Sequence, residues 1–190
     1  MNGYNEIYSY QASKGSGHSV WPTVTNHPLN SVSMASGVLY TYPQLVAKEF
    51  VVGSFKVCVD SLYTNPTNIL IGIYDDNNGY PGNLVAQTVE GNLTSTGVAT
   101  ISMSAPFALL PNRIYWIVIT AEYNLYMVGF NAYDLPPVLD VDDASFVGLK
   151  HISGYSYAGS YSGSLLASFP VSATKVLSNG SFPMCVVIIQ

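Results

Sequence analysis

Residues 69–74, Ile-Leu-Ile-Gly-Ile-Tyr, form a short apolar run with turn residues on both sides. Its length and its flanking turns predict a β-strand rather than a helix. Because side chains alternate across a strand, the three isoleucines share one face while Leu70 and Tyr74 share the other. The strand is therefore predicted to be buried on both faces. Gly72, which has no side chain, allows another part of the chain to approach closely.

The same pattern recurs along the chain. A second apolar run, residues 114–120, predicts another central strand. Farther upstream, clean alternation places Ile101 and Met103 inward. The parity of the apolar positions changes near Gly53, which predicts a β-bulge or a strand break there. The apolar run 186–189 predicts a strand inside a sheet rather than at its edge.

Turn signals rich in Gly, Pro, Asn and Ser separate the predicted strands at intervals of roughly 8–12 residues. No segment has the hydrophobic period of a convincing helix. The sequence therefore predicts an all-β fold, an antiparallel β-sandwich that forms one domain over residues 34–190. Residues 154–164, rich in Gly, Ser and Tyr, are predicted to form a loop.

Residues 1–33 differ from the rest, because they show no sustained strand or helix period and cannot form a core alone. Two interpretations stay open: a disordered tail, or an extended, irregular N-terminal arm that wraps a neighbouring subunit or attaches the protein to a larger assembly. Aromatic side chains spaced along the segment favour the arm, and they are its predicted partner contacts: Tyr4, Tyr8, Tyr10 and Trp21.

Composition narrows the class of protein. Charged residues make up 9% of the chain, against roughly 25% in typical soluble domains. The 15 tyrosines suit a surface that other proteins cover. A net charge of −5 with six scattered basic residues argues against partners such as nucleic acid or an anionic membrane.

No apolar run reaches the roughly 18 residues of a membrane helix, and the N-terminus does not resemble a signal peptide. We therefore expect synthesis and folding in a cytoplasm. Cys58 and Cys185 fit that compartment as buried thiols, with a disulfide between them as the alternative.

The acidic turn after the first apolar run offers oxygen ligands for calcium from Asp75, Asp76 and Asn77. A second acidic cluster farther along the chain offers Asp140, Asp142 and Asp143. The distal glutamate of a calcium loop is absent, and Asn-Gly is a strong hairpin signal. The pattern favours a plain turn, so no metal and no cofactor are expected.

Three tyrosines in the predicted loop, Tyr155, Tyr157 and Tyr161, alternate with Gly and Ser as in adaptable binding loops. An exposed contact with a neighbouring subunit is the first interpretation, with an unpartnered loop or a glycan site as alternatives. Catalysis has little support. The three histidines lack metal-ligand spacing, and no nucleophile elbow or phosphate-binding loop is present, so we expect no enzyme activity.

Two stretches carry a family resemblance: residues 71–85, IGIYDDNNGYPGNLV, and residues 107–117, FALLPNRIYWI. With residues 154–156 and 165–170, they resemble a β-sandwich module of bacteriophage virion proteins, with its GIY…D-N-G-x-P-G-x-L turn and L-x-P-G-x-Y-W strand. The likeness covers residues 38–190. Asn112 and Arg113 stand where that module usually has a glycine.

The resemblance implies a structural virion protein that assembles into a jelly-roll-like homo-oligomer, expected to be a trimer. We expect an external capsid-decorating (cement) or head-fibre protein, with other virion proteins such as the major capsid protein as partners. The alternative is a tail or fibre-tip module that binds a receptor or carbohydrate, such as a host surface glycan.

Overall fold

The computed structural model describes residues 19–20, 30–46, 49–64, 66–131, 152–177, 181–183 and 185–189. Within these ranges every named element is a strand, and every strand pairing is antiparallel. No helix in these ranges is long and apolar enough to cross a membrane. The predicted all-β antiparallel sandwich is confirmed.

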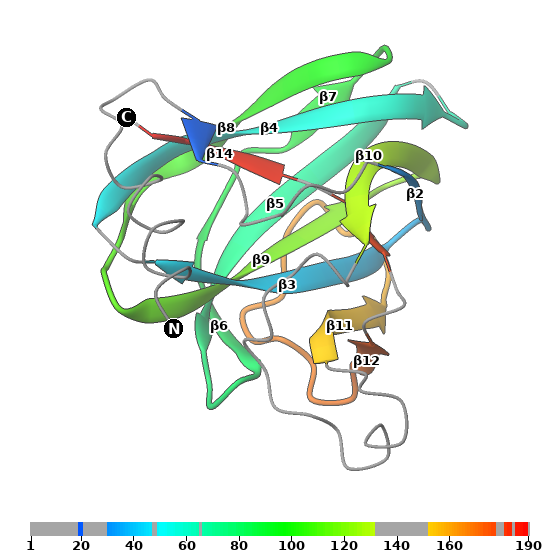
Figure 1. The fold of residues 1–190 in the computed structure, drawn as a ribbon. Coiled ribbons are helices and arrows are strands. Elements are labelled where there is room, and N and C mark those ends of the chain that lie inside the picture. The colour runs from blue at the N-terminus through cyan, green and yellow to red at the C-terminus, as the bar shows by residue number, and fades with distance from the viewer. Residues whose placement is uncertain are drawn as a thin grey trace.

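The strands form two sheets that pack face to face (Figure 1). Sheet A contains β1 (Ser19–Val20), β2 (Asn30–Met34), β4 (Phe50–Leu62), β8 (Gly97–Leu109), β10 (Leu125–Asn131), β13 (Ser181–Pro183) and β14 (Cys185–Ile189). Sheet B contains β3 (Val38–Val46), β5 (Thr67–Asp76), β6 (Pro81–Gln87), β7 (Gly91–Leu93), β9 (Arg113–Ala121), β11 (Ile152–Ala158) and β12 (Thr174–Leu177).

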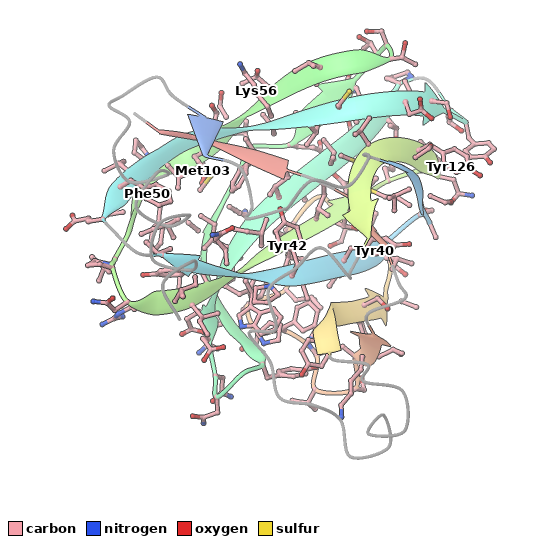
Figure 2. All side chains as sticks on the ribbon, viewed as in Figure 1. Tyr40, Tyr42, Phe50, Lys56, Met103 and Tyr126 are labelled. Atoms are coloured by element: carbon pink, nitrogen blue, oxygen red, sulfur yellow. The ribbon has the colours of Figure 1, made fainter. Side chains whose placement is uncertain are left out.

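The main core lies between the sheets. The three isoleucines of β5 are each fully buried there, together with Phe55 from β4. Ile101 and Met103 of β8 join the same cluster, as predicted. Phe55 is buried in this core, whereas its neighbour on β4, Lys56, extends into solvent from the outer side of sheet A (Figure 2).

The two predicted central strands are direct neighbours: β5 pairs with β9 over seven residues, with Ile71 opposite Ile119. Both strands are also buried on their outer face, as predicted for β5. There Leu70, Tyr74, Trp116 and Val118 form a second apolar cluster.

The chain between β11 and β12, residues 159–173 (orange in Figure 1), covers this outer face. It contributes Leu165 and Phe169 to the second cluster. A β-carbon on Gly72 would lie 2.3 Å from the Cδ1 atom of Leu165. The close approach predicted at this glycine is therefore confirmed.

Two finer predictions also hold. In the pairing of β14 with β4, Ile188 lies opposite Ser54 and the next residue, Ile189, lies opposite Val52, so Gly53 is the extra residue of a bulge. Strand β14 lies between β1 and β4, inside sheet A. Cys58 of β4 is a free, half-buried thiol.

Two predicted boundaries are wrong. The division between residues 33 and 34 falls inside β2, which pairs with β10, and β1 pairs with β14. Such short strands carry too few alternating positions to be recognised in sequence. In addition, the first part of the predicted loop 154–164 belongs to β11, which extends sheet B beyond β3. The rest of the predicted arm lies outside the described residues.

Val32 tests whether β2 belongs to the sandwich. It lies within the predicted arm, residues 1–33, yet it is only 6% exposed. Val32→Ala should lower the free energy of unfolding by about 2 kcal/mol, through lost apolar burial and the cavity left behind. Val98→Ala is the matched control, since that valine also lies in a strand but is 70% exposed. Urea denaturation measures both, and equal losses would contradict the placement of β2.

Candidate functional site

The acidic turn after β5 is held by its own carboxylates. Asn78 and Gly79 have φ angles of 55° and 82°, the left-handed conformations that the sequence predicted for this turn. The Asp76 carboxylate accepts hydrogen bonds from the Gly79 amide at 3.2 Å and from Nε1–H of Trp116 at 2.8 Å. Asp75 accepts one from the Asn83 amide at 2.5 Å.

These contacts give the acidic residues a structural role. In the part of the chain that the structure describes, no group of three or more His, Cys, Asp or Glu side chains could hold a metal ion. The calcium candidates of the second cluster, Asp140, Asp142 and Asp143, lie outside the described residues, as do Tyr4, Tyr8, Tyr10 and Trp21.

Tyr155 corrects the predicted contact loop. It is only 7% exposed, because β11 places it on the outer face of sheet B. Its ring centroid lies 4.5 Å from that of Tyr80 and 5.6 Å from that of Trp116. Burial raises the pKa of the Tyr155 hydroxyl above its ordinary value, and the nearby Asp76 carboxylate raises it further. Tyr155 therefore packs within this chain instead of presenting its ring to a partner.

Tyr157 and Tyr161 do come together. They line a pocket of about 150 Å³ between the turn at Gly37 and residues 159–166. Both side chains are half-buried. Three serines and two leucines also line the pocket: Ser160, Ser162, Ser164, Leu39 and Leu166. We call this concave feature the "tyrosine pocket".

The wall of the tyrosine pocket is fixed in place. Gly37 has a φ of 69°, and a β-carbon there would lie 2.7 Å from the carbonyl oxygen of Gly159. The Tyr161 hydroxyl donates a 2.6 Å hydrogen bond to the Glu90 carboxylate. Burial and this acceptor both raise the pKa of Tyr161, so its hydroxyl stays protonated and keeps donating.

Thr120 adds an unexpected polar group. It lies on β9 against the pocket and is 4% exposed, and its Oγ1 atom has no hydrogen-bond partner within the described residues. A buried hydroxyl left unpaired costs roughly 1–3 kcal/mol. Sequence reasoning missed this residue, because a threonine at the end of an apolar strand looks like an ordinary strand former.

A second feature that the sequence reasoning missed is a tyrosine patch (Tyr63, Tyr123 and Tyr126) at one end of the sandwich. Tyr63 is 64% exposed and Tyr123 is 42% exposed. The Tyr63 and Tyr126 rings lie 5.7 Å apart, and their hydroxyls form a 3.3 Å hydrogen bond. Tyr126 of β10 lies near the end of β4 (Figure 2). The sequence signal that could have revealed this patch is the position of its tyrosines beside predicted turns.

Comparison with known proteins does not identify a family for this chain. No protein-family model matches the chain, and no relative is found among curated proteins. Any statement about function therefore depends on the chemistry of these surfaces and on the motif resemblance.

Substitutions of Asp76 test whether the acidic turn has a structural role or serves to bind a ligand. Asp76→Ala leaves the buried Nε1–H of Trp116 without its acceptor and should lower the free energy of unfolding by about 1–3 kcal/mol. Asp76→Asn keeps an acceptor oxygen and should recover most of that loss. Urea denaturation followed by tryptophan fluorescence measures both variants, and equal destabilisation would show that the acceptor is not what matters.

Proposed function

We propose that the chain is a structural protein of a bacteriophage virion, an external capsid-decorating or head-fibre protein that works through subunit contacts. The observation that best supports this proposal is a weakly charged surface with an exposed tyrosine patch. Only 9% of all residues are charged. Tyrosine is enriched in protein interfaces, where charged side chains are depleted.

Further apolar side chains on the described surface support contacts between copies. Besides the patch, the exposed large apolar residues are Val85, Val89, Val98, Leu110, Leu166 and Val171. Singly exposed residues of this kind are normal. Together with so few charges, however, they favour a protein that buries much of its surface in an assembly. Tyrosine is suited to such a boundary, because it has a large apolar ring and a hydroxyl that can meet water.

The resemblance of residues 71–85 and 107–117 to phage sandwich modules supports the virion setting. In this proposal the copies form a trimer, and residues 1–18, which precede β1, attach it to other virion proteins such as the major capsid protein. The protein is then made in the host cytoplasm and resides on the particle.

A second candidate is a receptor- or carbohydrate-binding module at a tail or fibre tip. The tyrosine pocket favours it, because clefts that combine aromatic walls with a few converging polar groups are typical small-molecule sites. The two candidates share the same fold and differ in which surface has the essential partner.

The tyrosine patch gives the first test. Tyr63→Lys places a charge in the patch and should dissociate the oligomer, because like charges then meet or an ammonium group is buried. Light scattering after size-exclusion chromatography measures the mass of the assembly. Val171→Lys is the control, since that side chain is 91% exposed and lies outside the patch. A wild-type chain that is monomeric at high concentration would contradict self-assembly.

Particles that lack the chain separate the two candidates. A decorating protein should be present in hundreds of copies by quantitative mass spectrometry, and its loss should lower the temperature at which particles break while host adsorption persists. Adding back the full chain should restore stability, whereas a chain without residues 1–18 should not. Loss of adsorption with normal particle stability, and about a dozen copies, would favour the receptor-binding candidate.

A further inference from the structure

Two members of the tyrosine patch, Tyr63 and Tyr126, are held side by side by the backbone of sheet A. Leu62, the last residue of β4, lies opposite Leu125 of β10. The register continues by one residue, because the Tyr63 amide donates a 3.4 Å hydrogen bond to the carbonyl oxygen of Asn124. Tyr63 and Tyr126 are therefore diagonal neighbours across the two chain segments, at a separation that aromatic side chains can span.

The phenol groups of this pair meet through their hydroxyls. The ring centroids lie 5.7 Å apart with the ring planes inclined by 35°, and the Tyr63 hydroxyl donates a 3.3 Å hydrogen bond to the Tyr126 hydroxyl. In each ring, the two Cε carbons flank the carbon that carries the hydroxyl. Contact between the hydroxyls therefore brings a Cε carbon of one ring near a Cε carbon of the other.

A reagent in solvent can reach the pair. Tyr63 is exposed and Tyr126 is half-buried. Exposed side chains change conformation within nanoseconds or faster, so the rings can close the distance that remains between them. The hydrogen bond with Tyr126 raises the pKa of Tyr63, so this phenol stays protonated near neutral pH and the bond that aligns the rings persists.

Another tyrosine pair in the described residues shows that short distance alone is not sufficient. The rings of Tyr80 and Tyr155 are closer, with centroids 4.5 Å apart, but their planes are inclined by 62°. Their hydroxyls donate to two different carbonyl oxygens, those of Pro170 and Gly79. Tyr155 is also buried. This second pair therefore has neither aligned hydroxyls nor full access from solvent.

We propose that Tyr63 and Tyr126 form a site of oxidative cross-linking, at which a one-electron oxidant joins the two rings through a Cε–Cε bond. Each phenol gives one electron to the oxidant and one proton to water, which leaves a phenoxyl radical. The two radicals form the carbon–carbon bond, and the hydrogen on each bonded carbon then moves to the oxygen of its own ring. The chain loses two hydrogen atoms in all, and two equivalents of oxidant are reduced.

The product, a dityrosine, would tie the end of β4 covalently to β10. The bond closes a long loop of the chain, from residue 63 to residue 126. Closing a long loop lowers the entropy of the unfolded chain, as a disulfide does in the chain-entropy model. The inference goes beyond the proposed function and does not depend on it, because the reaction takes place within one copy of the chain.

A small photo-activated oxidant tests the proposal. The full chain in dilute solution is illuminated with a ruthenium(II) tris-bipyridyl complex and persulfate, which accepts the electrons and becomes sulfate. The monomer should gain dityrosine fluorescence and lose the mass of two hydrogen atoms, and the main cross-linked peptide pair in its digest should contain Tyr63 and Tyr126. Its melting temperature should rise by roughly 5–10 °C, because the closed loop destabilises the unfolded chain.

Tyr63→Phe and Tyr126→Phe keep the rings and remove the hydroxyls. Each variant should lose at least about half of the dityrosine fluorescence of the monomer, because the reaction no longer has a partner held nearby. Neither variant should gain melting temperature on oxidation. Tyr123→Phe is the matched control, since Tyr123 is an exposed tyrosine of the same patch that has no ring contact within the described residues. It should cross-link as the wild type does.

A wild-type monomer without dityrosine after illumination would overturn the proposal, as would fluorescence that persists undiminished in both phenylalanine variants. Covalent dimers in place of the bond within one chain would overturn it too, because these rings would then react with another copy sooner than with each other.

Discussion

The outer face of sheet B has to be covered, and the rest of the structure depends on this requirement. Strands β5 and β9 place Leu70, Tyr74, Trp116 and Val118 on that face, opposite to the main core. Full burial of a large apolar side chain contributes about 1.5–3 kcal/mol, so exposing all four would forfeit much of the stability of a domain. Residues 159–173 provide the cover, although they contain no regular strand pairing of their own.

An irregular cover must satisfy its own backbone groups, and aromatic hydroxyls do part of this. The Tyr74 hydroxyl donates to the carbonyl oxygen of Leu166 at 2.7 Å, and the Tyr80 hydroxyl donates to that of Pro170. Backbone bonds from Leu84 to Ala167 and from Phe169 to Gly82, each 2.9 Å, attach the cover to β6. The acidic turn belongs to the same arrangement, because Asp76 fixes Trp116 beneath the cover. A sequence that resembled a metal loop is thus one anchor of a packed layer.

The hydrophobic pattern of single segments correctly predicted the structural features that depend on the alternation of side chains along a strand. The alternation within residues 69–74 predicted two buried faces, and Gly72 predicted a close approach that Leu165 in fact makes. The identity of that neighbour could not be predicted, because it lies about ninety positions away along an irregular segment. Tyr155 was misread for a related reason: its Gly/Ser neighbours are typical of a loop, while its pairing partner Thr41 is remote in sequence. Pairing between distant segments, rather than local composition, decided its burial.

The cover also explains why a pocket exists beside it. A regular strand in this position would pack evenly over the sheet, whereas an irregular segment anchored at a few points leaves space between them. The space lies where Thr120 ends the apolar row of β9 on this face. Thr41 on β3 carries the same buried hydroxyl without a partner in the described residues, and nothing in the structure explains either one. A valine would remove the cost at either position, and departures from favourable packing are expected at functional sites. The anchoring of this irregular cover, through the close contact of Gly37 with Gly159 and the hydrogen bond of Tyr161 to Glu90, distinguishes the pocket from the other exposed surfaces of the sandwich.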